Sequence, residues 1–515
     1  MAMLVVALLL RVLIIFLPRD QLSTMILTDD AFYYFVIAQN IAEGSGVVFN
    51  TGVTTNGFHP LYMAILVPLF KILPGLDAPI RSALIILSIF STATAIPIYL
   101  LGVEIRSRIM GLVAAGWWLF NPYIFFVSLL GLEVAIELFF VATLTWYLAS
   151  RDSTLFQMSQ REWATSAILM ALAFLSRMDM AFLSISVFTI CAVRAISHAK
   201  NLRELLVNLR MPVAGGFFAS MLVAPWLVWS YSNLGRLTPT SGAVLRWEIA
   251  QYPDRYGTYL ESVEVAVHSA GLHVWYSFMY YRPESSITYR ISLITALMTL
   301  AILVGIIYKS GLFKKTLKKL DFLFLTAILY YLYYFFYQTD MRHWYGLFTA
   351  YILTIIIGIA IYTVYRKITY SSRSQFMKSV VIGIFVIIVI SASFNYAHIS
   401  SQESAGTGSM DRIEYINENI STDSTLGSFN TGRYQYYTPQ HEIINLDGLV
   451  NPESFDARRE GSLDSHLCKN NIKYVLDPPR DVENLYQSGI ELQEIKIWNH
   501  NSKYVLYKVT KIPNC

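Results

Sequence analysis

Charged residues are scarce in this chain of 515 residues, of which 14% are Asp, Glu, Lys or Arg and 55% are hydrophobic. A soluble protein of this size needs more charge to cover its surface, so the composition indicates a membrane protein. The net charge is only +4 at pH 7. The sequence therefore gives no reason to expect a nucleic-acid partner.

Cysteine is also rare, and its placement excludes the common metal-binding patterns. The chain has only Cys191, Cys468 and Cys515, and their spacing matches no zinc or redox motif. We expect Cys191, in an apolar run, to be a small core residue. Cys468 and Cys515 lie in the polar C-terminal part, where they could form one disulfide if that part is outside the cytoplasm.

Several catalytic signatures are missing as well. The sequence contains no P-loop, dinucleotide fingerprint, HExxH, paired CxxC or nucleophile elbow. A nucleotide donor bound on the cytoplasmic side is thus poorly supported. We do not interpret the N-terminus as a cleaved signal peptide, because Arg11 interrupts its apolar run and no small-residue cleavage site follows.

Long apolar runs predict a polytopic α-helical membrane protein with about eleven spans. Several runs are shorter than the roughly 20 residues that a bilayer needs. A brief apolar run from His59 to Leu73 is interrupted by prolines, and we expect it to lie in or dip into the membrane interface. The predicted spans are residues 3–19, 80–101, 109–128, 132–150, 163–176, 179–195, 211–231, 290–308, 320–337, 345–365 and 378–396.

Basic residues are concentrated in alternate loops, which predicts the orientation of the chain. Arg106 and Arg108 lie in one such loop, and a group of lysines from Lys309 to Lys319 lies in another, whereas the loops of opposite parity carry few. Basic loops face the cytoplasm. Loops 27–79 and 232–289 and the C-terminal part are therefore predicted to face outward from the cell membrane.

The chain changes character near residue 397, so we divide it into a membrane domain, 1–396, and an extracytoplasmic α/β domain, 397–515. The second part is long enough to have its own core. Its last two strands are expected to form an antiparallel hairpin. The pattern predicts a helix at 411–419 and strands at 425–429, 442–446, 472–476, 494–498 and 504–509.

The first outward loop opens with two adjacent acids, Asp29 and Asp30, followed by residues at helical spacing that include Tyr33. Either acid could cap that helix, because a carboxylate accepts the unpaired amide protons of the first turn. Capping needs only one acid, however. Two neighbouring carboxylates repel each other, and this repulsion raises the pKa of one of them. A general-base site at the membrane surface is the other interpretation.

Other polar residues are predicted at the same membrane face. Glu133 begins a span and needs a partner if it is buried, although an acid at a helix N-terminus is also favoured by the helix dipole. Arg177 and Asp179 divide one apolar stretch. They are interpreted as a solvated turn, as a structural ion pair or, for Arg177, as a phosphate ligand.

A cationic and aromatic cluster, Arg342, His343, Trp344 and Tyr345, occupies another outward turn. Guanidinium groups pair with phosphate oxygens and sugar rings stack on aromatic rings, but such residues also anchor helices at the interface. The long loop 232–289 carries further aromatic residues and Arg282. In the C-terminal part, Asp447 and Asn451 either contact an acceptor or stabilise their own loop.

These features together resemble the GT-C superfamily of membrane glycosyltransferases, and in particular bacterial and archaeal members that use polyprenyl-phosphate sugars. The resemblance is carried by LTDDAFYYFVIAQNIAEGSGVVFN and TTNGFHPLY, with support from GLEVA, LSRMDM, LTPTSG, MRHWY and INLDGLVN. The chain lacks the WWDYG signature of oligosaccharyltransferases, since Trp117 and Trp118 continue as Leu-Phe. That absence argues against transfer of a whole glycan to Asn.

The resemblance implies transfer of a single sugar from a polyprenyl-phosphate donor to a hydroxyl of a glycan, glycolipid or protein acceptor. Asp29 is then the preferred general base and Asp30 the second choice, with Glu133 orienting the acceptor or tuning the pair. Members of the superfamily differ in their use of a divalent metal, so Mg or Mn held by Asp29 and Asp30 stays open.

The same resemblance implies that fixed positive charge holds the donor phosphate. The candidates, in order of preference, are Arg342, Arg177 and His343. Substrate contacts are assigned to a wider set of polar and aromatic residues of the outward loops. These are Tyr33, Asn56, His59, Asp179, Trp344, Tyr345 and Arg282.

Two other function classes share part of this pattern. A polyprenyl-linked lipid or saccharide transporter (flippase) would need the spans and a phosphate-binding arginine, but not adjacent acids on one outward loop. A membrane-anchored carbohydrate-binding or assembly factor would use only the C-terminal domain. That second class leaves the many spans and the polar residues at membrane depth unexplained.

Overall fold

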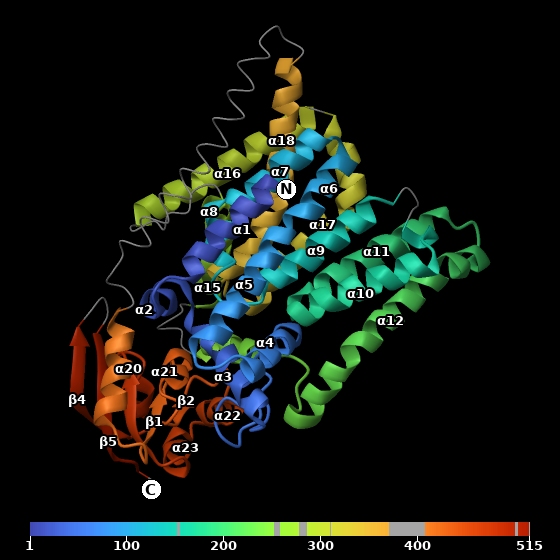
Figure 1. Ribbon diagram of the computed structural model, residues 1–515. Helices are drawn as coiled ribbons and strands as arrows, with labels where there is room; N and C mark the ends of the chain where they lie inside the picture. The colour runs from blue at the N-terminus through green and yellow to red at the C-terminus, as the bar shows by residue number, and fades with distance from the viewer. Residues whose placement is uncertain are drawn as a thin grey trace.

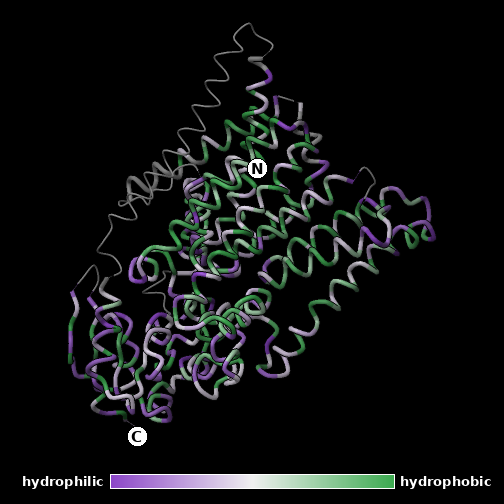
Figure 2. Tube along the Cα trace, viewed as in Figure 1, coloured by the Kyte–Doolittle hydropathy of each residue, from purple (hydrophilic) through white to green (hydrophobic). Residues whose placement is uncertain are grey.

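The computed structural model describes residues 1–151, 155–251, 258–277, 286–309, 311–369, 407–499, 503–513 and 515. A helical body forms one part of the molecule and a domain built on a β-sheet lies at one end of it (Figure 1). Hydrophobic residues are concentrated in the helices of the body, whereas the sheet domain is more hydrophilic (Figure 2). The predicted boundary near residue 397 lies outside the described residues.

Each predicted span that falls on described residues coincides with a helix, and the predicted span 378–396 lies outside them. Short 3-10 and π segments occur between several helices. The helices of the body are α1 (Ala2–Ile15), α2 (Arg19–Gln21), α3 (Asp29–Glu43), α4 (Pro60–Ile72), α5 (Asp77–Ala93), α6 (Ala95–Ile105), α7 (Arg108–Phe120), α8 (Pro122–Val127), α9 (Val134–Ala149), α10 (Gln160–Ser176), α11 (Ala181–His198), α12 (Leu202–Leu234), α13 (Thr240–Gln251), α15 (Tyr259–Tyr276), α16 (Ser286–Lys309), α17 (Leu312–Tyr333) and α18 (Gly346–Thr369).

The predicted number of about eleven spans is not confirmed. Among the described residues, five helical segments are long and apolar enough to cross a membrane, and a sixth is added if α1 and the bent segment Arg19–Ile26 form one span. Several other predicted spans are helices such as α7, whose 13 residues rise only about 20 Å, less than the roughly 30 Å of a hydrocarbon core. The five segments are Asp77–Ile105, Met178–His198, Leu202–Leu234, Lys318–Gln338 and His343–Arg366.

Small residues allow neighbouring helices to approach closely in the body. Gly102 on α6 faces Gly111 on α7, and a Cβ atom added to Gly102 would lie 2.4 Å from the Gly111 Cα atom. No larger residue fits this contact without moving a backbone. Close approach through glycine is typical of helix pairs that pack in a membrane.

Helix α3 follows the first bend of the chain and begins with the acidic pair. Its N-cap residue is Thr28, and Asp29 and Asp30 occupy the first turn. The expectation that one of the two acids caps this helix is therefore wrong, although acids in a first turn are still favoured by the helix dipole. Helix α4, which starts at Pro60, matches the short apolar helix expected after the loop.

The C-terminal domain contains one mixed sheet with the strand order β2-β1-β3-β5-β4. The first three strands pair in parallel, and β5 pairs antiparallel with both β3 and β4. The predicted strands, the helix near 411–419 and the terminal antiparallel hairpin are thus confirmed. The elements are α20 (Thr407–Asn419), β1 (Thr425–Ser428), α21 (Gly432–Tyr437), β2 (Ile443–Asn445), α22 (Pro452–Glu460), α23 (Leu463–Lys469), β3 (Ile472–Asp477), α24 (Glu483–Gln487), β4 (Glu491–Asn499) and β5 (Lys503–Lys511).

Cys468 and Cys515 form a disulfide, with their Cα atoms 5.7 Å apart. The bond connects the end of α23 to the last residue of the chain. Cys191 is buried and unbonded on α11, as expected for a small core residue.

The C-terminal domain is attached to the body by hydrogen bonds that involve the first loop. Both oxygens of the Asp29 carboxylate accept backbone N–H groups at the start of α21, from Gly432 at 3.1 Å and from Arg433 at 3.0 Å. The Arg433 side chain in turn donates to the Leu27 carbonyl. Asp29 therefore supplies an N-terminal cap to a helix more than 400 residues away in the sequence.

A second part of the same loop is bonded to strand β2. The Asn50 amide nitrogen donates to the Ile443 carbonyl at 2.8 Å, and its oxygen accepts from the Asn445 backbone at 3.0 Å. Asn50 is almost completely buried. The loop that follows α3 thus extends the hydrogen bonding of the sheet edge and fixes the domain against the body.

The cap between the domains can be tested by substitution of Asp29. We expect Asp29→Ala to lower the free energy of unfolding by about 1–2 kcal/mol, because two N–H groups of α21 lose their acceptor. Asp29→Asn should lose less, since the amide oxygen still accepts one of the bonds. Chemical denaturation of the purified full-length protein in detergent measures both changes.

Asp20→Ala is the matched control, because Asp20 is exposed on α2 and its carboxylate makes none of the hydrogen bonds among the described residues. The cap would be refuted if Asp29→Ala and Asp20→Ala had the same stability.

Candidate active site

A cavity of about 660 Å³ lies where the helical body, residues 238–248 and the C-terminal domain meet. This volume is within the range of pockets that hold small ligands. The cavity brings together most of the site residues predicted from the sequence. Those that line it are Asp30, Tyr33, His59, Glu133, Arg177, Asp179, Arg342, Trp344 and Tyr345.

The two acids of the first loop point in different directions. Asp30 lines the cavity together with Tyr33 and Tyr34, which follow it by three and four residues and so lie on the same face of α3. Asp29 is not among the lining residues, and its carboxylate is bonded to α21. A step of one residue turns the side chain by about 100° around a helix, which separates the neighbours.

Burial raises the pKa of the Asp30 carboxyl to about 6. The positive charge of Arg342 acts in the opposite direction, and the negative charges of Asp29 and Glu133 add to the increase. A carboxyl with this pKa is ionised at neutral pH and can still accept a proton efficiently.

Arg342 is the cation opposite Asp30. It precedes the short helix His343–Tyr345, and its Nε atom donates to the Asp340 carboxylate at 2.8 Å. The Arg342 side chain is 44% exposed. Trp344 and Tyr345 follow it into the cavity wall, whereas His343 is not among the lining residues; its ring packs against Trp344 and its carbonyl accepts a hydrogen bond from the Tyr123 hydroxyl.

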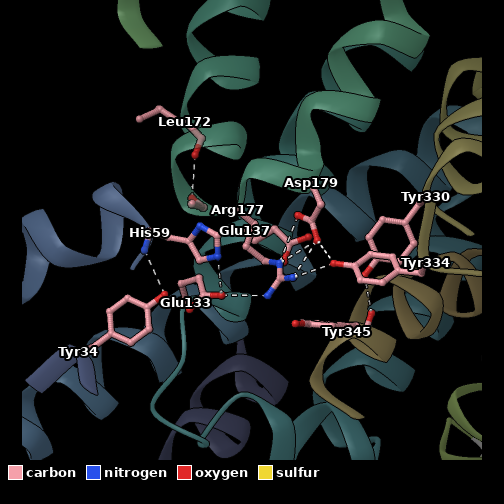
Figure 3. A network of polar contacts seen from close by, with 11 residues as sticks. Tyr34, His59, Glu133, Glu137, Leu172, Arg177, Asp179, Tyr330, Tyr334 and Tyr345 are labelled. Carbon is pink, nitrogen blue, oxygen red and sulfur yellow. Dashed lines mark hydrogen bonds and ion pairs between the residues drawn. The ribbon is translucent and has the colours of Figure 1, made fainter. Parts of the chain in front are cut away.

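Arg177 lies at the centre of a buried network of carboxylates (Figure 3). Its Nη1 atom is 3.0 Å from Glu133, its Nε atom 3.2 Å from Glu137, and its Nη2 atom 2.8 Å from Asp179. The guanidinium also lies over the ring of Tyr345, at 4.7 Å from its centroid. The expected partner of Glu133 is thus Arg177, and the Arg177–Asp179 ion pair is confirmed.

This network surrounds one positive charge with three carboxylates. Each carboxylate is at least 90% buried, so its charge is poorly solvated and depends on Arg177. Tyr334 donates to the Asp179 carboxylate at 2.8 Å and supports the same arrangement. A guanidinium that is engaged in this way is poorly placed to bind a further anion.

His59 extends the network toward α3. Its Nε2 atom is 3.6 Å from Glu133, and its backbone N–H donates to the Tyr34 hydroxyl at 3.2 Å. Burial lowers the pKa of the His59 imidazole, so the ring is neutral at pH 7. The other Glu133 oxygen, Oε2, is buried without a hydrogen-bond partner in the described part of the chain.

One predicted substrate contact has another position. Asn56 is completely buried outside the cavity lining. Its side chain donates to Ser230 and to the Thr238 carbonyl and accepts from Thr240, so it holds the turn that precedes α13. The remaining one, Arg282, lies outside the described residues.

The C-terminal domain contributes residues that the sequence did not rank among the sites. Asp447, considered there only as an acceptor contact or a loop residue, lines the cavity and accepts a hydrogen bond from the Tyr33 hydroxyl at 3.0 Å. Burial raises its pKa to about 7. Asn451 instead caps α22 by accepting the Ser454 N–H.

Further lining residues were missed entirely. Glu248 from α13 and Arg458 from α22 line the cavity and pair at 2.7 Å. Glu137 was missed from the Arg177 network, although its position one helical turn after Glu133 was a usable signal. Glu248 and Arg458 carry no such signal, because both resemble ordinary exposed charges in the sequence.

The acidic pair does not form a metal site. Among the described residues, no group of three or more His, Cys, Asp or Glu side chains is arranged to hold an ion. Asp29 uses both oxygens for backbone N–H groups, which leaves Asp30 as the single carboxylate of the pair in the cavity. The acidic pair in this arrangement therefore does not fit a resident divalent metal.

Comparison with protein-family models gives a match for the C-terminal domain. Residues 395–508 match a family described as a domain of unknown function (DUF8728). No curated protein matches the chain. Sequence relatives therefore provide no function for either domain.

Solved structures give a clearer result for the whole chain. The archaeal oligosaccharyltransferase AglB from Archaeoglobus fulgidus, in complex with an inhibitory peptide and a dolichol-phosphate, is similar over 95% of this chain and 70% of its own, with a TM-score of 0.53 and 14% identity. ArnT from Cupriavidus metallidurans, bound to undecaprenyl phosphate, is similar over 99% and 98%, with a TM-score of 0.52 and 10% identity. Both are GT-C glycosyltransferases.

This chain has the GT-C fold. At such low identity the similarity establishes the architecture and not the substrates. The five long apolar helical segments of the described residues agree with the composition expected of a multi-pass membrane protein. A further structure of the Archaeoglobus fulgidus enzyme was solved as a complex with Zn and sulfate, at a TM-score of 0.51 and 15% identity over 92% of this chain and 67% of its own.

Proposed function

We propose that this protein is a membrane glycosyltransferase that moves a single sugar from a polyprenyl-phosphate donor to a hydroxyl group of a glycan, glycolipid or protein acceptor. The observation that carries the proposal is the presence of Asp30 and Arg342 in one cavity next to the apolar helices. The cavity thus combines a proton acceptor with a cation that can receive a phosphate. The similar structures contain dolichol-phosphate and undecaprenyl phosphate, which supports a donor of this class.

In this proposal the acceptor oxygen attacks the anomeric carbon of the donor sugar. The acceptor O–H proton moves to the Asp30 carboxylate as the new C–O bond forms. The bond between the anomeric carbon and the phosphate oxygen breaks, and its electron pair leaves with the polyprenyl phosphate. Arg342 stabilises the negative charge on the departing phosphate, as fixed cations do in phosphate-transfer sites.

Asp30 is a better candidate for the base than Asp29, which was preferred from the sequence alone. A base must reach the proton that it removes, and Asp30 lines the cavity. Both oxygens of Asp29 are occupied by the N–H groups of α21. We therefore assign Asp29 to positioning of the helix that carries Asp30.

Arg342 is likewise a better phosphate ligand than Arg177 or His343. Arg177 is surrounded by the carboxylates of Glu133, Glu137 and Asp179, which would repel a phosphate. The ring of His343 packs against Trp344, and His343 is not one of the cavity-lining residues. Arg342 has one carboxylate partner and is partly exposed.

We also propose that the C-terminal domain faces outward from the cell membrane. The distribution of basic loops predicts this orientation, and a disulfide between Cys468 and Cys515 is typical of oxidising compartments. A membrane-impermeant amine reagent should then label lysines of this domain, such as exposed Lys469, on intact cells. Labelling only after the cells are lysed would place the domain in the cytoplasm and exclude the orientation.

The role of Asp30 can be tested by Asp30→Asn. We expect the variant to lose between about 100-fold and 10,000-fold in the rate of sugar transfer, the range of general-base catalysis, with unchanged affinity for undecaprenyl phosphate. In the wild type, transfer should fall as the pH drops below about 6, because the base becomes protonated. Transfer of radiolabelled sugar from a polyprenyl-phosphate donor by purified protein measures the rate.

Asp29→Asn is the matched control for this experiment, because it makes the same change at the neighbouring residue outside the cavity. It should retain far more activity than Asp30→Asn. Equal rates for wild type and Asp30→Asn would eliminate the acid–base role. A transporter would show this result, since it binds the lipid without removing a proton.

The role of Arg342 can be tested by Arg342→Ala. The loss of a charge-assisted hydrogen bond to phosphate should weaken binding of undecaprenyl phosphate by about 10-fold to 100-fold. Arg161→Ala is the control, because Arg161 is exposed on α10 and is not a lining residue. Quenching of tryptophan fluorescence by added lipid phosphate measures the affinity. An Arg342→Ala variant that binds as tightly as Arg161→Ala would exclude this residue as the phosphate ligand.

A further inference from the structure

The three parallel strands of the C-terminal domain end at the cavity. Phe429 and Asn430 follow β1, Asp447 lies two residues after β2, and Arg480 and Asp481 lie shortly after β3. All five residues line the cavity. The domain therefore presents the carboxyl edge of its parallel strands to the space that also contains Asp30.

This edge includes the point where the strand order reverses. The chain passes from β1 to β2 on one side and then returns to β3 on the other side of β1. In open α/β sheets, ligands bind outside the carboxyl ends of the strands at such a switch point. The topology thus marks this part of the cavity as a binding site, independently of the residues in the helical body.

We name this part of the cavity the strand-end wall and define it by the following residues. They come from the loops after β1, β2 and β3 and from the start of α24. The members are Phe429, Asn430, Asp447, Arg480, Asp481 and Asn484.

The strand-end wall offers hydrogen-bonding groups that the protein does not use. Within the described part of the chain, no hydrogen bond involves the side-chain amide of Asn430 or Asn484, while the backbone N–H of Asn430 is bonded to Ser428. An amide side chain both donates and accepts. Two such groups at one cavity wall suit the paired donor and acceptor character of sugar hydroxyls.

The charges on this side of the cavity are balanced. Arg480 faces Asp481, with Nε at 3.6 Å from the carboxylate. Arg458, next to the wall, pairs with Glu248 at 2.7 Å and donates to the Asp447 carbonyl at 2.6 Å. Since the wall itself has one cation, Arg480, beside two acidic residues, Asp447 and Asp481, it favours a neutral ligand over an anionic one.

An apolar surface lies among the polar groups. Phe429 is held in place because its backbone N–H donates to the buried Asp477 carboxylate at 2.9 Å. Leu449 and Val450 line the cavity on the same side. Sugar rings combine hydroxyl groups with apolar C–H faces, and binding pockets for such ligands combine polar and apolar contacts in the same way.

We propose that the strand-end wall is the acceptor subsite and that the acceptor presents a neutral saccharide there. The name acceptor subsite rests on the proposed glycosyltransferase function, whereas the saccharide binding stands on the wall itself. The saccharide hydroxyl that reacts points to Asp30, and the donor phosphate lies on the opposite side at Arg342. The domain that matches a family of unknown function thereby acquires a role in recognition of the acceptor.

The experiment uses the full-length protein in lipid nanodiscs and a panel of neutral hexose disaccharides as probes. Saturation-transfer NMR measures disaccharide binding to the wild type and to the double variant Asn430→Ala/Asn484→Ala. We expect at least one disaccharide to bind the wild type, and the double variant to bind it at least about 10-fold more weakly, because two hydrogen bonds are lost. Undecaprenyl phosphate affinity should stay the same.

Asn419→Ala is the matched control, because Asn419 is exposed on α20, outside the cavity lining, and its side chain donates to the Tyr415 carbonyl of the same helix. This control should bind the disaccharide as the wild type does. The assignment is overturned if no disaccharide of the panel binds, if the double variant binds as well as the control, or if a serine-containing peptide competes for the wall and the saccharides do not. Saccharide binding without any transfer from a polyprenyl donor would refute the proposed function. The strand-end wall would still be a saccharide-binding site.

Discussion

The capping of α21 by the Asp29 carboxylate is the contact on which the geometry of the cavity depends. It joins the first turn of α3 to the C-terminal domain through two backbone hydrogen bonds. Asp30 is the next residue on the same turn, so the direction of its side chain is fixed by the position of its neighbour. Tyr33, one turn later, is bonded to Asp447 of the same domain. Helix α3 is therefore held at two successive turns, and the cavity lies between the strand ends and the face of α3 that carries Asp30 and Tyr33.

The second constraint is electrostatic. Arg177 is bonded to all three carboxyl groups around it, and water has little access to them. Such a network is stable only in a fixed arrangement, because each carboxylate would be costly without its hydrogen bonds. It keeps the region of the cavity near Glu133 negative, whereas Arg342 makes the region near Asp30 more positive. An anionic group is thereby directed to one end of the cavity.

Local patterns in the sequence predicted part of the fold. Apolar runs predicted the helices of the body that fall on the expected spans, and the strand signals predicted β1 to β5, because helix and strand periodicity depend on near neighbours. Helices α13, α15 and α21 to α24 were not predicted. The number of membrane crossings was not predictable in the same way. Helices such as α7 and α8 are separated by Asn121, which precedes Pro122 at the start of α8, and only packing decides whether a broken segment crosses the membrane.

The site was predicted less completely, since its contacts connect distant parts of the chain. Glu133 and Arg177 were both identified, but they are 44 positions apart in the sequence, and nothing in it indicated that they form an ion pair. Asp29 and Asp30 were equivalent in the sequence, and only the position of the C-terminal domain distinguishes them. The strand-end residues follow short strands whose order is set by tertiary pairing. Such pairing leaves no local signal in the sequence.

The bond between Cys468 and Cys515 has a consequence for how the protein matures. It closes a loop of 47 residues that contains β3, β4 and β5, and closure of such a loop stabilises a fold by about 4 kcal/mol in the chain-entropy model. Cytosolic glutathione would keep the two thiols reduced. With the outward orientation proposed above, the last three strands would gain this disulfide only after export, and the sheet of a newly synthesised chain would be less stable until the bond formed.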